Sequence, residues 1–337
     1  MAKLGNLYNL QSFADAKAHA SKMVKQFNQF SDAAGLTLAR NMVAIDPKIY
    51  TQQFPNLTFL SGTGIGVNNA GGSANIIMKL KKSVSGSFRN ADDVSRDKGL
   101  ISLDVEQGMG IPVTGRQAHS NWNDDDVTNA KVENINLVSD LIGAHNKVYH
   151  QEIDEIGYIG LKFNDDVTTK FGGLLNNTIF ATTGATKTID TMSGDEMYNE
   201  FRELLMSQWT GVNNIQAYMA DTLVTSLKVY TYLTTTFINT AGGLATVLEA
   251  LQKSFKESNG TQLKIVITHY AGKLVGGKDV AVAFNSTADS MVFRIPKTLE
   301  IGKIIQDGSF NFKFDSRYRV GALDIHESVS GKRLTGL

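Results

Sequence analysis

A glycine-rich run is the first segment of the chain whose residues could do chemistry. Gly62, Gly64 and Gly66 are spaced like the glycines of a dinucleotide-binding turn. Such a turn needs a helix N-terminus after the glycines, because helical N–H groups hold the pyrophosphate. Here the apolar run that follows, Ile76–Lys81, has the character of a strand. We therefore interpret residues 62–72 as a hinge and retain a nucleotide-binding enzyme as a remote alternative.

Two histidines are candidates for metal ligands. His145 and His150 lie in a segment with helical periodicity, and their five-residue spacing places them on different faces of a helix. No carboxylate pattern of the HExxH kind accompanies them, as it would at many zinc sites. We interpret both as ordinary surface or packed histidines.

Acidic residues form two groups that could also do chemistry. The consecutive carboxylates Asp124–Asp126 could ligate a hard cation, but they precede a predicted helix, where N-caps and negative charge stabilise the terminus. The second group consists of Glu152, Asp154, Glu155, Asp165 and Asp166. No apolar pocket is visible around it to separate two carboxyl pKa values, so we interpret it as a solvated acidic face. The sequence thus predicts no catalytic, metal-binding or cofactor-binding residue.

The composition narrows the function classes further. The 337 residues are 42% hydrophobic, enough for a large core in one elaborate domain or two. Lys plus Arg and Asp plus Glu each total 33, so the chain lacks the basic character of proteins that wrap nucleic acid. The absence of Cys excludes disulfides and thiolate sites, and it suits a cytoplasmic origin. No apolar stretch has the length of a signal peptide or a membrane span, so we expect neither.

The N-terminal third is predicted to contain peripheral elements. Apolar residues at helical spacing predict an amphipathic helix over residues 12–34. Pro47 and Pro55 then bias the chain towards an extended arm. Strands at Ile76–Lys81 and Leu100–Val105, joined by a charged stretch, predict a long hairpin with a polar tip. Its mixed charges favour pairing between subunits over binding to nucleic acid.

The rest of the chain predicts one long helix and then alternating helices and strands. The long helix is expected to begin within residues 121–126 and to end near Ile156, which makes it about 30 residues or ~45 Å long. Further helices are expected at 193–205, where Ser193 and Glu196 have the spacing of a capping box, and at 222–232 and 243–255. From Leu263 onward the apolar period is two, which predicts a largely antiparallel sheet.

Several short phrases of the sequence resemble one known family. Ile45–Tyr50 and Phe54–Leu57 resemble the N-terminal arm of a branch of tailed-bacteriophage major capsid proteins, where Ile-Asp-Pro-x-Ile-Tyr precedes Tyr/Phe-Pro-Asn-Leu. Gly157–Leu161 and Gly173–Asn177 resemble the phrases that follow the long helix of that branch, and Tyr318–Ile325 resembles its closing strand. These phrases occur in the same order as in that family, along nearly the whole chain. The chain therefore resembles proteins with the Hong Kong 97-type capsid fold.

The resemblance implies an α+β fold with five parts. These are an N-terminal arm with a short helix (1–60), an extended hairpin or E-loop (61–120), the spine helix and the start of the peripheral domain (121–187), the axial domain (188–274), and the remaining peripheral sheet with the C-terminal strand (275–337). The resemblance further implies that the spine helix and sheet form a plate. Axial domains would meet around capsomer axes, and the arm and hairpin would overlap neighbouring subunits.

The resemblance also implies a function. The chain is expected to be a structural protein, not an enzyme, that assembles as hexamers and pentamers into an icosahedral head. This head would enclose phage DNA without sequence-specific binding, and no cofactor is implied. Scaffolding, portal and decoration proteins are the implied partners, and the virion is the implied location after assembly in the host cytoplasm. An encapsulin nanocompartment shell, which has the same fold, is the main alternative.

The arm and the hairpin supply the candidate contact residues between subunits. They are Ile49, Tyr50, Phe54, Lys82, Phe88, Arg89, Asp92, Asp93 and Arg96. The segment Trp122–Asp124 departs from the family pattern, in which an aromatic residue is followed by Ser, and no pair of residues can be assigned to a covalent cross-link. No long charged scaffolding extension precedes the arm, so scaffolding would be a separate protein or the helix at 12–34 would serve.

Overall fold

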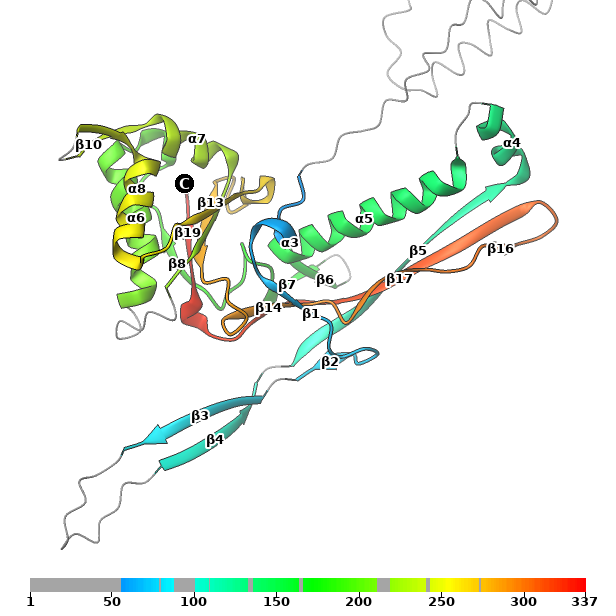
Figure 1. Ribbon diagram of the computed structural model, residues 1–337, viewed down its shortest axis with the longest axis horizontal. Coiled ribbons are helices and arrows are strands. Elements are labelled where there is room, and N and C mark those ends of the chain that lie inside the picture. The colour runs from blue at the N-terminus through cyan, green and yellow to red at the C-terminus, as the bar shows by residue number, and fades with distance from the viewer. Residues whose placement is uncertain are drawn as a thin grey trace, which may run out of the picture. The chain divides into compact units, whose positions relative to one another are not determined.

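The structure of the chain is a computed structural model (Figure 1). It describes residues 56–78, 80–87, 101–108, 110–132, 136–163, 166–210, 219–240, 243–272 and 274–337. The chain divides into two compact units, Met1–Phe54 and Pro55–Leu337, and every described residue belongs to the second unit. The predicted helix at 12–34 and the predicted arm around Pro47 lie outside the described residues.

A long antiparallel pair of strands organises one sheet. β5 (Ile111–Asn123) and β17 (Asn311–Gly321) pair residue by residue along the whole of β17. β15 (Lys297–Ile301) and β16 (Ile305–Gln306) pair with the other edge of β17. β2 (Ile76–Ile77) pairs with the first residues of β5 and completes the sheet.

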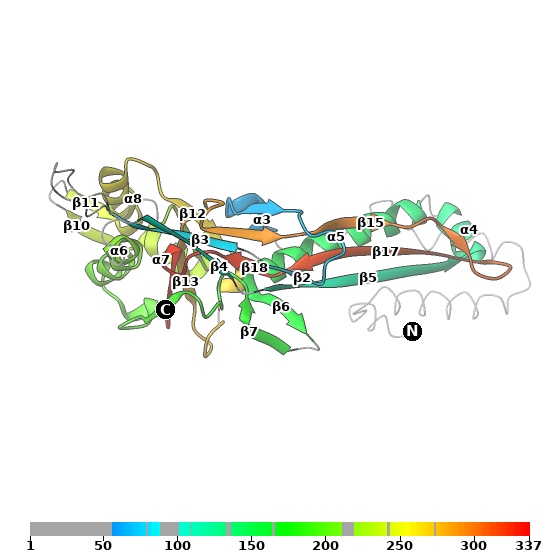
Figure 2. The same cartoon turned by 90° about the horizontal axis from the view of Figure 1, so that it is seen from below.

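One face of this sheet is covered by a long helix. Phe314, Tyr318 and Val320 are buried in β17 at even spacing, so their side chains share one face. The helix α5 (Leu137–Ile159) lies along this face (Figures 1 and 2), and the ring of its Tyr149 meets that of Tyr318 edge-on at 4.9 Å. The apolar side of an amphipathic helix thus closes the core over the sheet.

The prediction of one helix from residues 121–126 to Ile156 is wrong in its first part. β5 continues to Asn123, the short helix α4 (Asp124–Val132) follows, and α5 begins at Leu137. α5 is 23 residues long and is the long helix of the fold. Apolar spacing alone is compatible with one continuous helix, so the break depends on local polar groups.

Two asparagines provide these polar groups. The Oδ1 atom of Asn123 accepts from the N–H of Asp126 at 2.6 Å, and the Asp126 carboxylate accepts from the N–H of Asn123 at 3.1 Å. At the start of α5, the Asn136 side chain accepts from the N–H of Ser139 at 3.3 Å. Each side chain satisfies a backbone donor that has no partner in the first turn, so each marks the start of a separate helix. The interpretation of Asp124–Asp126 as caps and first-turn residues agrees with this geometry.

A second sheet has five strands. Their order is β12 (Lys264–Ile267), β9 (Thr222–Thr225), β13 (Val280–Phe284), β19 (Gly331–Thr335) and β8 (Ala181–Gly184). β13 is antiparallel to both of its neighbours, whereas β12 is parallel to β9 and β19 is parallel to β8. The C-terminal strands are therefore mostly antiparallel, as predicted, but β12 is not.

Three helices belong to the core on one side of this sheet. They are α6 (Gly194–Thr210), α7 (Leu227–Thr235) and α8 (Val247–Asn259). In β13, Ala281 and Ala283 belong to the core that these helices share, while the alternate residues belong to the core that includes α5. The central strand β13 is therefore buried on both faces and connects the two cores.

The capping box predicted at the start of α6 is confirmed. The N–H of Ser193 donates to the Glu196 carboxylate at 2.8 Å, and the N–H of Glu196 donates to Oγ of Ser193 at 3.3 Å. The pKa of Glu196 is lowered to about 2, most strongly by a hydrogen bond from Lys187 and next by the one from the Ser193 backbone. The short local pattern Ser-x-x-Glu was sufficient to locate this helix.

The helices predicted at 222–232 and 243–255 begin later than expected. Residues 222–225 are strand β9, and residues 243–246 are strand β11 (Gly243–Thr246), which pairs with β10 (Phe237–Thr240). Short apolar runs fit either a helix or a strand. Residues 222–225 form a strand because they pair with β12 and β13, which are distant in the sequence.

The glycine-rich run leads into a strand. α3 (Phe59–Gly62) precedes the run and β1 (Gly66–Asn68) follows it. β1 pairs in parallel with β14 (Met291–Arg294), and β14 pairs with β18 (Leu323–Ile325). No helix begins after these glycines within residues 63–78, so the segment is not arranged like a dinucleotide-binding turn.

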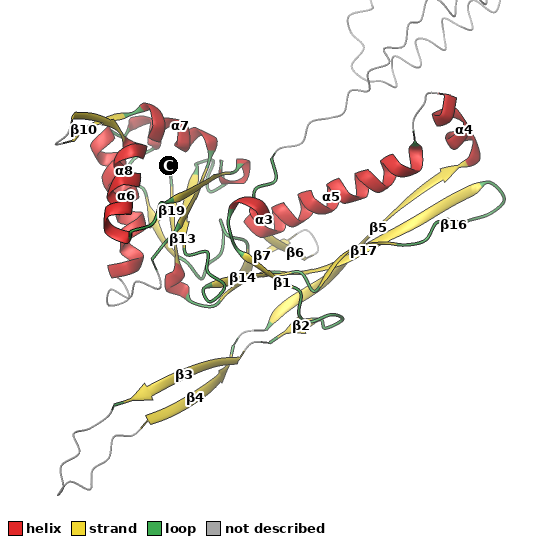
Figure 3. Cartoon of the chain, viewed as in Figure 1, coloured by secondary structure: helices red, strands yellow, loops and turns green. Residues whose placement is uncertain are grey.

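The remaining strands form two ribbons. β6 (Gly160–Phe163) pairs with β7 (Asp166–Gly172) after α5, and β3 (Leu80–Gly86) pairs with β4 (Ile101–Gln107) as a separate two-stranded ribbon (Figure 3). Short 3-10 helices occupy Ile189–Thr191, His269–Ala271 and Ser328–Ser330. Among the described helices, none is both long enough and apolar enough to cross a membrane.

Glycines permit close contacts at the C-terminal end of α5. A Cβ atom at Gly157 would lie 2.4 Å from the ring of Phe59, and one at Gly173 would lie 2.3 Å from the backbone of Tyr158. The N–H of Leu174 donates to the carbonyl of Gly157 at 2.8 Å. The two glycine-containing phrases singled out in the sequence therefore pack against each other, and a side chain at Gly173 would separate them. A side chain at Gly157 would instead displace the ring of Phe59.

Candidate contact surfaces

The β3–β4 ribbon has two chemically different faces. Val84 lies opposite Leu103 in the antiparallel register, so their side chains project from the same face. On the other face, the Oγ atoms of Ser85 and Ser102 are hydrogen-bonded at 2.7 Å. We call the first face the apolar ribbon face, and it consists of Leu80, Val84, Ile101, Leu103 and Val105.

The apolar ribbon face is exposed. Its five side chains are 52 to 72% exposed, although full burial of each would stabilise the protein by roughly 1.5–3 kcal/mol. A two-stranded ribbon is marginally stable without a further layer. Several exposed apolar side chains on one face of such a ribbon are typical of a surface that another chain covers.

The predicted contact residues fall mostly outside the described part of the chain. Lys82 belongs to β3 and is paired with Val105 of β4. Those outside the described residues are Ile49, Tyr50, Phe54, Phe88, Arg89, Asp92, Asp93 and Arg96. The sequence analysis did not select the apolar residues of the ribbon, although their alternation in β4 was a usable signal.

A second apolar patch lies at the turn between β15 and β17. Ile304, Ile305 and Phe310 are 50, 53 and 70% exposed. The carbonyl of Phe310 accepts from the N–H of Asp124 at 3.0 Å, which ties this turn to the start of α4. The patch is therefore held in a defined position, as a contact surface requires.

A groove between α5 and the β5–β17 pair contains His145. Its Nε2 atom is hydrogen-bonded to Oγ of Ser120 at 2.8 Å, and its Nδ1 atom to Oγ of Ser316 at 2.6 Å. Its ring also lies 4.8 Å from that of Phe314. His145 thus joins the helix to the sheet, whereas His150 is exposed. These are the packed and surface environments predicted for the two histidines.

The part of this groove that contains Arg116 and Glu152 is polar. The Nε atom of Arg116 lies 3.4 Å from the Glu152 carboxylate, with both side chains about one-third exposed. Burial, and then the nearby Glu152 carboxylate, raise the pKa of Tyr318 well above its ordinary value. Arg116 and Glu152 are thus paired within the groove.

The prediction of a solvated acidic face over residues 152–166 is wrong for Asp154. Its side chain is buried, and Oδ1 accepts from the N–H of Phe59 at 2.7 Å. Burial raises the pKa of Asp154. Glu152 and Glu155 are partly exposed and pair with Arg116 and Lys162. The hydrogen bond between Asp154 and Phe59 joins α5 to α3. Because Phe59 is distant in the sequence, this burial of Asp154 was not visible there.

Sequence analysis also missed a buried ion pair. The Arg294 guanidinium donates to Oδ2 of Asp324 at 2.8 and 3.3 Å, and His326 Nε2 lies 3.3 Å from the same oxygen. Asp324 is 1% exposed in its side chain. The pair joins β14 to β18. A charged residue within each of two apolar strands could have indicated the pair, because a buried charge needs a partner.

The described side chains include no cluster with the composition of a metal site. Across these segments, no group of three or more His, Asp or Glu residues could hold a metal ion. The arrangement that the structure does provide is one of exposed apolar faces on well-defined scaffolds. Such faces support association with other chains.

Comparisons with known proteins agree on one family. A family model described as major capsid protein matches residues 90–337. The capsid of Myoviridae phage XM1 is 35% identical, with a TM-score of 0.76 over 89% of this chain and 98% of that chain. A structure from Mycobacterium phage Bobi and the capsid of an empty GTA particle share the fold at 11 and 10% identity. Both have TM-scores of 0.57, over 87 and 90% of this chain and 94 and 98% of theirs. A search of curated proteins found no match.

Proposed function

The chain belongs to the major capsid protein family, and from this membership we propose that it forms the hexamers and pentamers of an icosahedral head. It is a shell-forming protein of a bacteriophage virion with the Hong Kong 97-type fold. An encapsulin-type nanocompartment shell is not favoured by these relationships. Its role in the proposal is structural and not enzymatic.

The apolar ribbon face is the observation that supports assembly most directly. Five apolar side chains on one face of a two-stranded ribbon are exposed in the single chain. In the proposal, a neighbouring subunit covers them. Permanent assemblies bury about 2,000 to 5,000 Å² per interface, and the ribbon supplies part of that area.

The proposal also assigns roles to the parts of the chain. The segment 1–60 is an arm and 61–120 an extended hairpin, and both overlap neighbouring subunits. The spine helix and the sheet at 121–187 and 275–337 form the peripheral plate, and 188–274 is the axial domain. The contact residues expected in the arm and hairpin, from Ile49 to Arg96, would lie at these overlaps.

The shell would enclose DNA without binding a particular sequence. Lys plus Arg equals Asp plus Glu in this chain, so its net charge provides little general attraction to phosphate. Assembly would take place in the host cytoplasm. Portal, scaffolding and decoration proteins are the partners that a head of this kind would require or accept.

Adjacent residues of β4 provide a matched test of the ribbon. Leu103 projects from the apolar face and Ser102 from the polar face. Leu103→Asp should lower the yield of closed shells at least tenfold, because it would place a charge against an apolar partner surface. Ser102→Asp adds the same charge on the opposite face and should assemble like the wild type. The measurement is the sedimenting fraction of the purified full chain, checked by negative-stain electron microscopy.

Equal shell yields from the two variants would remove the ribbon from the proposed interface. A wild-type chain that forms no capsomers or shells under any salt condition would contradict the proposed function itself. In that case a thermal shift with common nucleotides would test the remote enzyme alternative.

A further inference from the structure

The turn between β16 and β17 contains the one Asp–Gly dipeptide of the sequence, Asp307–Gly308. Residues 301–310 are all exposed, and the Asp307 side chain is 63% exposed. Gly308 has a φ of 91°, and an ideal Cβ there would meet no atom within 4 Å. Only glycine adopts this backbone conformation readily. The peptide bond between the two residues is therefore open to solvent and is not shielded by a side chain at residue 308.

The backbone nitrogen of Gly308 is not held by the hairpin. The bond that closes the turn is made by its neighbour Asp307, whose N–H donates to the carbonyl of Asn311 at 2.8 Å. The N–H of Gly308 itself donates to no acceptor among the residues that the structure describes. A movement of this nitrogen towards the Asp307 carboxyl group therefore breaks no hydrogen bond of its own. Contact between the two groups is the main requirement of a reaction within one chain.

We propose that Asp307 is a site of spontaneous isoaspartate formation. The nitrogen of Gly308 attacks Cγ of Asp307, so that a C–N bond forms, one C–O bond of the carboxyl group breaks and water leaves with the N–H proton. The product is a five-membered succinimide ring. Water then opens the ring at the former backbone carbonyl, which becomes a carboxylate, and the main chain now runs through Cβ and Cγ. One water is lost and one is gained, so the step needs no oxidant or cofactor.

Lys313 slows this reaction by pairing with the carboxylate. Its Nζ atom lies 2.8 Å from Oδ2 of Asp307. The hydrogen bond to Asp307 raises the pKa of Lys313, so the lysine stays charged and favours the charged form of its partner. A carboxylate is a poor electrophile, and the neutral carboxyl group is the form that loses water. Because ion pairs between exposed side chains are weak, the reaction is slowed and not prevented.

The product would alter the turn that carries the second apolar patch. Isoaspartate adds one carbon to the main chain after Asp307, between Ile304 and Ile305 on one side and Phe310 on the other. The N–H of Asp307 is fixed to the carbonyl of Asn311, so the extra carbon must be accommodated within the few residues between them. The spacing of the three apolar side chains would therefore change.

Labelling by an isoaspartyl methyltransferase tests the site. The purified full chain is incubated near neutral pH and digested with trypsin, which releases residues 304–313 as a peptide with Asp307 as its one acidic residue. Label should accumulate in this peptide with time while its mass stays unchanged, because isoaspartate is an isomer of aspartate. Asp307→Glu keeps the carboxylate but would require a six-membered ring, so it should stay unlabelled. An unlabelled wild-type peptide, with a labelled synthetic peptide of residues 304–313 as the control, would overturn the inference.

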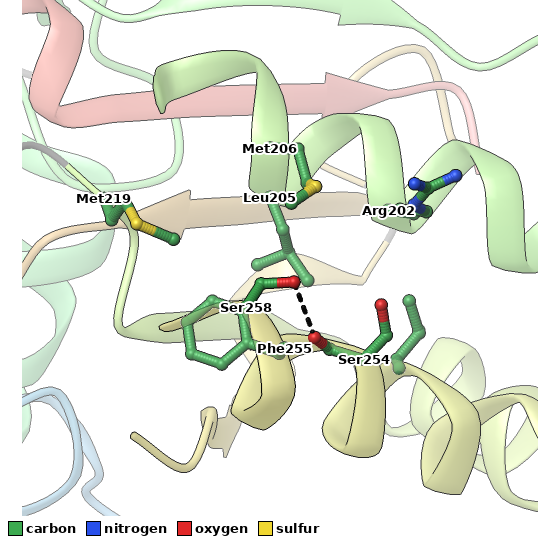
Figure 4. Close-up of a pocket in the computed structure, with 8 residues that line it drawn as sticks. Arg202, Leu205, Met206, Met219, Ser254, Phe255 and Ser258 are labelled. Atoms are coloured by element: carbon green, nitrogen blue, oxygen red, sulfur yellow. Dashed lines mark hydrogen bonds between the residues drawn. The ribbon is translucent and has the colours of Figure 1, made fainter. Parts of the chain in front are cut away.

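A matched variant compares one reaction at two backbone geometries. The native Asn259–Gly260 pair ends α8 beside Ser258, which lines the small pocket between α6 and α8 (Figure 4). The N–H of Gly260 donates to the carbonyl of Lys256 at 2.8 Å, so the helix cap holds this nitrogen. Asp307→Asn places the same dipeptide in the exposed turn. Deamidation, measured as the mass change from NH2 to OH, should be about tenfold faster at 307 than at 259, because one hydrogen bond need not break first. Equal rates, or a faster reaction at 259, would overturn the role of the turn.

Removal of the lysine tests its part separately. Lys313→Gln removes the charge that stabilises the carboxylate, and it should raise the rate of labelling at Asp307 about two- to fivefold. Circular dichroism checks that the variant is folded. An unchanged or lower rate would overturn the role assigned to Lys313.

The effect of the modification on assembly rests on the proposed function and is measured on aged wild-type protein. Shells and unassembled chains are separated by sedimentation, and isoaspartate in residues 304–313 is measured in both fractions. Its content should be severalfold higher in the unassembled chains, because the altered patch disfavours incorporation. Asp307→Glu, aged in the same way, should keep the shell yield of its fresh protein. Equal contents in the two fractions would overturn this effect, whereas failure of fresh wild-type protein to form shells would overturn the proposed function.

Discussion

The contact between Phe59 and Gly157 permits a prediction in which one substitution changes sign with its background. Phe59 is fully buried, and its ring meets those of Tyr158 and Phe293 edge-on at 5.2 and 5.1 Å. A Cβ at Gly157 would lie 2.4 Å from the same ring, far inside contact distance. The side chain of Phe59 therefore occupies the space that any side chain at residue 157 would need.

The magnitudes follow from packing and helix propensity. Gly157→Ala in the wild type should destabilise the subunit by about 1–3 kcal/mol through overpacking, offset in part by the better helix propensity of Ala. Phe59→Ala should cost about 3–5 kcal/mol, because it leaves a cavity and removes two aromatic contacts. In the Phe59→Ala background the clash is absent, so Gly157→Ala should be neutral or stabilising by up to ~1 kcal/mol.

The assay is urea unfolding of the four proteins as unassembled subunits, followed by circular dichroism. We expect a favourable coupling energy of at least ~1 kcal/mol between the two sites. Additive effects within about 0.5 kcal/mol would refute the packing argument. So would a stabilising effect of Gly157→Ala in the wild type.

The two buried carboxylates should respond differently to substitution. Because burial raises the pKa of Asp154, the folded chain binds that proton more tightly than the unfolded chain. The contribution of Asp154 to the free energy of unfolding is therefore fully present below the ordinary carboxyl pKa near 3.8. It is lost as the pH rises through the raised pKa of Asp154 in the folded chain. The melting temperature of Asp154→Asn should therefore rise relative to that of the wild type as the pH increases from about 4, and a constant difference would contradict this. Asp324→Ala leaves Arg294 buried without its partner and should cost about 3–5 kcal/mol in chemical unfolding; a cost below ~1 kcal/mol would show that solvent replaces the pair.

Local patterns predicted the features that depend on neighbouring residues. The capping box of α6 involves residues three apart, and the structure forms both of its hydrogen bonds. The strands β13, β14 and β17 follow the period-two spacing of their apolar residues. In each of these segments the information lies within a few residues of the chain.

Features that depend on distant partners were not predictable in this way. Asp154 looks solvated in the sequence because its partner, the backbone of Phe59, lies 95 residues away. β9 was assigned to a helix because its pairing with β12 and β13 is invisible locally. The helix break at Asn136 had a local signal in its cap. The apolar periodicity of the surrounding segment outweighed that signal.

The hairpin was predictable from the sequence, but its exposed apolar face was not. The sequence indicated a hairpin with a polar tip, and charged residues were chosen from that tip. The register of β3 against β4 shows instead that Val84 and Leu103 share an exposed apolar face. Alternation in each strand was visible in the sequence, but only the pairing places both apolar rows on one side.

Assembly of the full chain is the central claim, and electron microscopy of the purified, expressed protein after size exclusion tests it most directly. We expect closed icosahedral shells, or rings of five and six subunits, in which the apolar ribbon face is covered by a neighbouring chain. A protein that elutes as a monomer at every salt concentration, with no rings or shells on the grid, would contradict it.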